Sequence, residues 1–163
     1  GFPADDISVI VHPQSVIHSM VEMVDGSVIA QLGVTDMKHA IQYALTYPER
    51  KENCLESLDF ARFNNLTFEE PDTDRFPCLG LAYRALRSGG TLPAVLNAAN
   101  EISVQAFLDG RIKLSEVAAI NQEVMNAHAV VDADSFGGIL AADSWARLNA
   151  SARVSETANA AGN

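Results

Sequence analysis

Cysteine, basic residues and long apolar runs are all scarce in this sequence of 163 residues. The two cysteines, Cys54 and Cys78, each stand alone, which excludes a disulfide framework or a cysteine-based zinc site and fits a reducing compartment. With 11 Lys and Arg against 21 Asp and Glu, the formal net charge is -10, which argues against nucleic acid or an anionic membrane surface as a partner. No run approaches the roughly 18 apolar residues of a membrane helix, so we expect no membrane span. The apolar share of 48% is typical of one ordinary globular domain or two small ones.

The sequence also lacks the short motifs that identify common catalytic sites. It contains no G-x-G-x-x-G dinucleotide loop, no P-loop, no H-E-x-x-H zinc motif and no G-x-S-x-G nucleophile elbow. No charged segment followed by an apolar one precedes the first apolar run, so we expect no signal peptide in it. It begins with Gly1 rather than Met, so we expect it to be cut from something longer. Composition and pattern therefore indicate an α+β protein without revealing a reaction.

The first part of the chain predicts sheet followed by helix. Residues 7–11 are β-branched and apolar except for one serine, which predicts a buried strand. Residues 15–24 and 27–32 flank Asp25-Gly26, a dipeptide that favours a β-hairpin with a type I′ turn.

A helix is expected next, capped by Thr35 or Asp36 and ended by Pro48. Its apolar residues recur at helical spacing at Met37, Ala40, Ile41, Ala44 and Leu45. Between residues 49 and 71 the periodicity fades, which indicates an irregular connecting segment.

The remainder of the chain predicts four helices joined by short glycine-bearing turns, typical of a small antiparallel four-helix bundle. Residues 151–163 are small and polar, and we expect them to form a flexible tail. The first helix is expected to start at Asp72 or Asp74 and to end at Gly89-Gly90, and the second to run from Thr91 to Gly110. The third is expected to start at Ser115, and the fourth to follow Gly137-Gly138.

Histidines and acidic residues suggest metal sites, but their spacing does not support one. His12, His18 and His39 offer no third and fourth ligand at a useful spacing, so we favour hydrogen-bonded or exposed histidines. The acidic run of Glu69, Glu70, Asp72 and Asp74 lacks the glycine and spacing of a calcium loop, which favours a solvated loop.

A polar stripe interrupts the second expected helix of the bundle. Asn97, Asn100 and Glu101 share one face, because they are three or four residues apart. They could face a ligand or a neighbouring domain. We favour the alternative, that they hydrogen-bond the backbone of a connecting loop.

Several longer motifs follow one another along the chain. They are His12-Pro-Gln-Ser-Val-Ile-His-Ser-Met-Val21, Asp25-Gly-Ser-Val28, Ala30-Gln-Leu-Gly33, Leu66-Thr-Phe68, Arg75-Phe-Pro-Cys-Leu79 and Leu96-Asn-Ala-Ala-Asn-Glu101. In this order they resemble 1-deoxy-D-xylulose 5-phosphate reductoisomerases, and the resemblance runs from about Val9 to about Val124.

This resemblance implies part of an enzyme that rearranges deoxyxylulose phosphate and reduces it with NADPH to 2-C-methyl-D-erythritol 4-phosphate, using Mg or Mn, in non-mevalonate isoprenoid biosynthesis. Family members are homodimers, and the family's NADPH-binding domain and metal ligands lie upstream of the matching stretch. The resemblance thus implies that binding residues for both cofactors are absent here. The implied partners are the missing N-terminal part of the enzyme, a second copy of the chain and a small-molecule substrate.

The resemblance also divides the chain and selects two residues. Residues 1–48 correspond to the end of the catalytic and dimerisation domain, 49–71 to a connecting segment and 72–150 to the C-terminal helical domain. His12 and Met37 stand where family residues approach the substrate, although the usual Pro-Asp-Met-Arg-Thr-Pro around Met37 is here Thr-Asp-Met-Lys-His-Ala.

Two interpretations follow. The chain is the C-terminal portion of such an enzyme, inactive without its N-terminal part, and we favour the bacterial cytosol over the plastid stroma as its location. The alternative is a non-catalytic binding or dimerisation module derived from the same fold.

Overall fold

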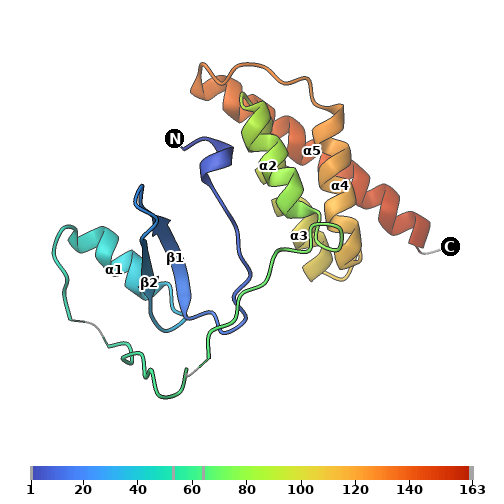
Figure 1. Ribbon diagram of the computed structural model, residues 1–163. Helices are drawn as coiled ribbons and strands as arrows, with labels where there is room; N and C mark the ends of the chain where they lie inside the picture. The colour runs from blue at the N-terminus through green and yellow to red at the C-terminus, as the bar shows by residue number, and fades with distance from the viewer. Residues whose placement is uncertain (1, 53, 64, 162–163) are drawn as a thin grey trace. The chain divides into compact units, whose positions relative to one another are not determined.

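The computed structural model describes residues 2–52, 54–63 and 65–161 (Figure 1). Its elements fall into two units, one of Val9–Pro71 and one that joins the residues up to Ser8 to those from Asp72 onward. The first unit contains β1 (Ile17–Glu22), β2 (Val28–Leu32) and α1 (Lys38–Thr46). The second contains a 3-10 turn, η1 (Ala4–Asp6), and the helices α2 (Cys78–Ser88), α3 (Leu92–Leu108), α4 (Leu114–Ala127) and α5 (Phe136–Ala161). The mixed α+β class predicted from the sequence is thereby confirmed.

The predicted hairpin is present, but its turn differs from the predicted type. β1 and β2 pair antiparallel, from Glu22 opposite Val28 at the turn to Ile17 opposite Leu32 at the far end. The N–H of Gly26 donates to the carbonyl of Met23 at 2.9 Å, and Gly26 has a φ of 82°. A type I′ turn needs positive φ at both central residues, whereas Asp25 has none. The connection is a three-residue loop in which glycine alone takes the left-handed conformation.

The strand predicted at residues 7–11 is wrong. Ile7 to Ile10 form no strand, and each of the apolar side chains in that run is 42% exposed. Only Val11 pairs, through an isolated bridge in which its N–H and carbonyl bond those of Glu69 at 2.9 and 3.0 Å. A continuous β-branched run becomes a buried strand only where other strands flank it. Among the described residues, only Glu69 pairs with this run, and it pairs with Val11 alone.

Helix α1 begins at Lys38 after the N-cap residue Met37, one residue later than a cap at Asp36 predicts. The Oδ1 atom of Asp36 accepts the N–H of Lys38 at 2.8 Å, so Asp36 satisfies one of the free donors at this end. No residue of α1 is buried, and Ile41 and Leu45 lie exposed on it. The apolar residues of α1 thus form one face of the helix, and no other described part of the chain covers that face.

All four helices predicted after residue 72 are present, and α3 packs against each of the other three. The core they share is closely packed, with Val95, Ala98, Val124 and Val154 almost inaccessible to solvent. Bundle geometry itself stays a prediction.

Three of the predicted helix starts are wrong. α2 begins after Pro77 rather than at Asp72 or Asp74. α4 is capped at Lys113, whose N–H is accepted by Glu116 Oε2 at 2.6 Å, and not at Ser115. α5 starts at Phe136, so the glycine pair that follows lies inside its first turn.

The tail predicted to be flexible is helical as far as the structure describes it. α5 continues through Ser151 to Ala161, and Val154 is fully buried. Its buried positions recur every fourth residue, at Ala142, Ala146, Ala150 and Val154, and this spacing places them on one face of the helix. Residues 162 and 163 of the predicted tail lie outside the described residues. None of the described helices combines the length and apolarity needed to cross a membrane.

Candidate functional site

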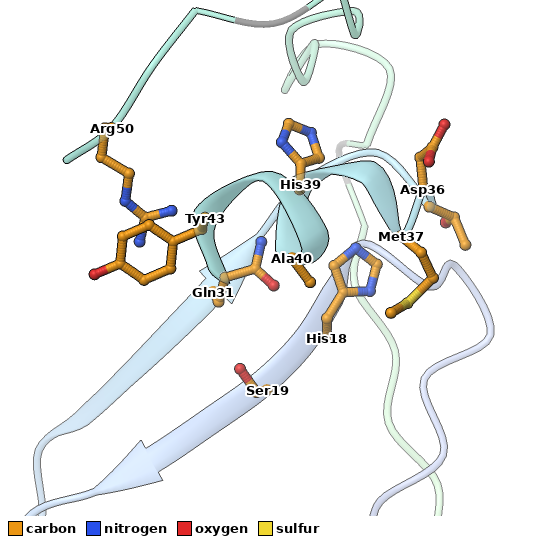
Figure 2. A pocket seen from close by; sticks show the side chains of 10 residues that line it. His18, Ser19, Gln31, Asp36, Met37, His39, Ala40, Tyr43 and Arg50 are labelled. Carbon is orange, nitrogen blue, oxygen red and sulfur yellow. The ribbon is translucent and has the colours of Figure 1, made fainter. Parts of the chain in front are cut away.

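A cleft of about 500 Å³ in the first unit brings together polar side chains from the hairpin, α1 and the segment that follows α1 (Figure 2). Figure 2 shows α1 lying across the two strands, with the imidazole of His18 and the side chain of Met37 at one end and Arg50 at the other. The lining residues are His18, Ser19, Gln31, Thr35, Asp36, Met37, His39, Ala40, Tyr43 and Arg50.

The hairpin register positions His18 in this cleft. Ile17 pairs with Leu32 and Ser19 with Gln31, so the register shifts by one residue and His18 is the extra residue beside the end of β2. The Nε2–H of His18 donates to the carbonyls of Gly33 and Val34 at 3.2 and 3.3 Å. Carbonyl oxygens only accept, so these contacts assign the proton to Nε2, and in the neutral ring Nδ1 is an acceptor.

Asp36, the one carboxylate of the cleft, is already engaged. Its Oδ1 accepts the backbone N–H of Lys38 at 2.8 Å, and its Oδ2 lies 3.3 Å from Lys38 Nζ. The backbone hydrogen bond, together with the positive charge of Lys38 and the nearby His39, lowers the pKa of Asp36 below its usual value. The carboxylate is therefore held ionised and paired.

The far end of the cleft carries a cation. The guanidinium carbon of Arg50 lies 3.6 Å from the centre of the Tyr43 ring, within the range of a cation–π contact. Tyr43 also contacts Tyr47 edge to face, with ring centres 5.7 Å apart. The edge-to-face contact with Tyr47 thus supports the ring against which Arg50 lies.

The structure does not bring the two sequence-predicted site residues into one cleft. Met37 lines it and is 69% exposed, so its thioether is accessible. His12 is not among its lining residues. Its Nδ1–H donates to the carbonyl of Thr67 at 2.9 Å, and its ring stacks on Phe68 with centres 4.9 Å apart. Its Nε2 atom is buried and, among the described residues, has no hydrogen-bond partner.

His18 is the lining residue that sequence reasoning missed as a site residue, because it was considered only as a metal ligand. The signal in the sequence was only partial. The Asp25-Gly26 turn accounts for the pairing as far as Ser19 with Gln31, whereas the one-residue shift at His18 does not follow from the turn.

The polar stripe on α3 is explained by other helices and not by a loop backbone as predicted. Asn97 Nδ2 donates to Glu101 Oε1 at 3.0 Å, and Glu101 Oε2 accepts from Arg147 of α5 at 2.7 Å. Asn100 Oδ1 accepts from Asn121 of α4 at 2.9 Å. The stripe thus joins α3 to α4 and α5.

The described residues do not supply a ligand set for a metal ion. In residues 2–52, 54–63 and 65–161, no three His, Cys, Asp or Glu side chains gather closely enough to hold one. In the cleft itself, Lys38 already pairs with the carboxylate of Asp36. A divalent cation that prefers several oxygen ligands therefore does not fit these residues.

The comparison with protein families gives a match over most of the chain. Residues 32–149 match the family model described as the DXP reductoisomerase C-terminal domain.

Curated relatives and solved structures agree with that match. The 1-deoxy-D-xylulose 5-phosphate reductoisomerase of Trichlorobacter lovleyi is 55% identical over 148 residues, which are 91% of this chain and 38% of the relative. That of Cupriavidus metallidurans is 51% identical over 158 residues, 97% of this chain and 40% of the relative. The Zymomonas mobilis enzyme, solved in complex with NADPH, matches with a TM-score of 0.81 and 46% identity over 89% of this chain and 38% of that one. A reductoisomerase solved with fosmidomycin and magnesium matches with a TM-score of 0.83 and 40% identity, over 92% of this chain and 40% of that one. The chain thus spans about two fifths of the length of the proteins it matches.

Proposed function

Because the chain belongs to the 1-deoxy-D-xylulose 5-phosphate reductoisomerase family, we propose that it forms the C-terminal part of an enzyme that converts 1-deoxy-D-xylulose 5-phosphate to 2-C-methyl-D-erythritol 4-phosphate. The observation that carries this proposal is the family match over residues 32–149. The 55% identity to a curated relative over 148 residues supports it. NADPH and Mg or Mn are the cofactors of this proposed activity. Solved relatives contain NADPH or magnesium, which supports both for the longer protein.

The proposal assigns the parts of the chain to parts of the enzyme. Residues 1–48 would end the catalytic and dimerisation domain, residues 49–71 would connect it onward, and residues 72–150 would form the C-terminal helical domain. The exposed apolar side chains of the hairpin support a larger assembly, since Val21, Val28 and Ile29 are 58%, 55% and 60% exposed. Exposed apolar strands usually mark surfaces that pair or pack elsewhere. We propose that the N-terminal part of the enzyme and a second copy of the chain, in a homodimer, cover these exposed strand side chains. We place the enzyme in the bacterial cytosol.

The cleft would serve the substrate side of the active site. Met37 and His18 line it, and the ring of His18 presents an accepting Nδ1 once Nε2–H is bonded to the two carbonyls. Such an acceptor suits a substrate hydroxyl. His12 would support the site from outside the cleft through its contacts with Thr67 and Phe68.

An assay of NADPH oxidation tests whether the cofactor and metal ligands lie in the rest of the enzyme and not in this chain. With deoxyxylulose phosphate and manganese, the isolated chain should oxidise no NADPH, because we assign the cofactor and metal ligands to the N-terminal part. Turnover by the isolated chain would contradict that assignment.

A non-catalytic binding or dimerisation module is the second candidate, and the exposed hairpin also favours it. Size-exclusion chromatography with light scattering distinguishes this candidate function from the enzymatic one. A discrete, stable monomer or dimer of the isolated chain supports the module, whereas polydisperse aggregates support a part that needs the remainder of an enzyme to cover its sheet.

A further inference from the structure

Residues 2–8, here called the strap, precede the hairpin in the sequence but pack with the helices that follow it. The residues up to Ser8 form one compact unit with those from Asp72 onward, and η1 of the strap lies beside α2 (Figure 1). The chain therefore leaves the helical unit after Ser8, forms the hairpin unit and re-enters the helical unit at Asp72.

Two side chains on one face of α2 contact the strap. Tyr83 Oη donates a 2.8 Å hydrogen bond to the carbonyl of Ile7, which is 76 residues away in the sequence. Arg87 Nη2 lies 3.2 Å from Asp5 Oδ1, and the guanidinium carbon of Arg87 lies 5.5 Å from the centre of the Tyr83 ring. Because Tyr83 and Arg87 are four residues apart, they lie on the same face of the helix. Together they present a hydroxyl donor and a cation to the strap.

The 3-10 turn of the strap leaves two accepting groups for that face. The N–H of Asp6 donates to the carbonyl of Pro3 at 3.1 Å, and the N–H of Ile7 donates to the carbonyl of Ala4 at 3.3 Å. The turn thus uses the carbonyls of Pro3 and Ala4. The carbonyl of Ile7 and the carboxylate of Asp5 are the groups that bond α2.

The charges of the strap and of α2 are complementary. Asp5 and Asp6 are acidic, whereas α2 contains Arg84 and Arg87 and no acidic residue. The side chains of Arg87 and Asp5 are 61% and 86% exposed, so their ion pair contributes little to the docking. The hydrogen bond from the half-buried Tyr83 contributes more. A segment held by so few contacts can detach from α2 without unfolding the helices.

We infer that the strap is a releasable tie between the two proposed domains of the enzyme, docked on the face of α2 that carries Tyr83 and Arg87. The inference rests on the proposed function, which assigns residues 1–48 to the catalytic domain and residues 72–150 to the helical domain. Domains joined by one linker move relative to each other by default. The docked strap adds a second attachment to that of residues 49–71, and it restrains this motion until the strap detaches.

Docking of the strap is measured without cofactor, substrate or turnover, so its failure and the failure of the proposed function are distinguishable. A strap that docks on α2 would stand as a finding even if the chain supported no reductoisomerase activity. A strap that does not dock would leave the proposed reaction unchanged.

The test is hydrogen–deuterium exchange of the whole 163-residue chain, measured by mass spectrometry in peptides that cover the strap. Tyr83→Phe removes the hydroxyl and keeps the ring. The amides of Asp6 and Ile7, which close the turn, should exchange about fivefold faster in this variant, the worth of one neutral hydrogen bond. Arg87→Met should speed their exchange about twofold, because it removes only an exposed ion pair. Peptides from α3 should exchange as in the wild type, which shows that the helices remain folded.

The matched control is Arg84→Met, on the same helix. Arg84 bonds Asn126 of α4 at 2.7 Å, and its replacement should leave the exchange of the strap unchanged. A double-mutant cycle gives a second readout, since Asp5→Asn should add nothing once Arg87→Met is present. Equal exchange of the strap in the wild type and Tyr83→Phe, equal acceleration by Arg84→Met, or additive effects of the Asp5 and Arg87 substitutions would overturn the proposal.

Discussion

Ser103 of α3 donates a 2.8 Å hydrogen bond to Asn121 Oδ1 of α4, and both residues are fully buried. The amide nitrogen of Asn121 in turn donates to Asn100 Oδ1 at 2.9 Å. The polar contact therefore fixes the register of two helices whose other facing residues are apolar, because any slide of one helix would leave buried polar atoms without partners.

Replacing Asn121 should be costly. Asn121→Ala removes both bonds. It leaves Asn100 Oδ1 without this donor and Ser103 Oγ with only its 3.2 Å bond to the carbonyl of Asn100, so we expect the free energy of unfolding to fall by about 2 kcal/mol. Urea unfolding measures the change. Gln122→Ala, at the exposed neighbouring position of the same helix, should change it by less than about 0.5 kcal/mol. Equal effects of the two substitutions would show that the buried network contributes nothing.

The turn between α2 and α3 leaves no room for a side chain at its second glycine. Gly90 has a φ of 54°, and a Cβ there would lie 2.4 Å from the carbonyl oxygen of Val131. We expect Gly90→Ala to lower the free energy of unfolding by about 3 kcal/mol, from left-handed backbone strain and the clash together. Gly110→Ala is the control, since Gly110 has a φ of 72° but open space around it. It should cost about 1 kcal/mol, measured in the same urea series. If both variants were equally stable, the close approach of Val131 would be absent in solution.

The last turns of α5 should contribute to stability. Val154 is fully buried, so Val154→Ala removes two methyl groups from the core and should cost about 2 kcal/mol. Leu148→Ala, on the same helix but 74% exposed, should change the free energy of unfolding by less than about 0.5 kcal/mol. Thermal unfolding followed by circular dichroism compares the two. A Val154→Ala variant as stable as the wild type would mean that this end of α5 is not packed on the core.

Acid should weaken the second unit through His128. Its Nε2 lies 2.8 Å from Thr91 Oγ1 and its ring packs on Trp145, and burial lowers its pKa below the ordinary value of 6.5. Below about pH 6.5 the unfolded chain therefore binds a proton more readily than the folded chain, so stability falls as the pH falls, until the folded-state pKa is passed.

The pH effect is isolated by comparing the wild type with His128→Gln, which keeps a polar group beside Thr91 but cannot titrate. Urea unfolding at pH 7.5 and pH 5.0 should show a larger loss of stability for the wild type. All other titrating groups are shared, so an equal loss in both proteins would contradict the assigned role of His128.

Local signals made the hairpin and the helices predictable from the sequence. Asp25-Gly26 fixes the chain reversal through its own backbone and through the Asp25 carboxylate, which accepts the N–H of Ser27 at 2.9 Å. Val117, Ile120 and Val124 recur at helical spacing in the sequence, and all three are buried.

Features that depend on distant partners could not be predicted in this way. A strand at residues 7–11 needs neighbours that the local pattern does not specify. The buried face of α5 consists mostly of alanines. Such small side chains give little contrast in hydropathy with the polar residues around them, so the sequence pattern did not indicate a buried helix face. In the cleft, Arg50 reaches Tyr43 through an irregular segment, and no periodicity reports such a contact.

The most direct test of the central claim is a fusion that replaces the matching C-terminal part of the Zymomonas mobilis reductoisomerase with this chain. The two match over 89% of this chain with a TM-score of 0.81, so the replacement exchanges one part for another of similar fold. The measurement is NADPH oxidation in the presence of deoxyxylulose phosphate and magnesium. If this chain is the C-terminal part of a reductoisomerase, the fusion oxidises NADPH only when the sugar phosphate is added. A folded fusion that binds NADPH but leaves it unoxidised with the sugar phosphate present would contradict the account.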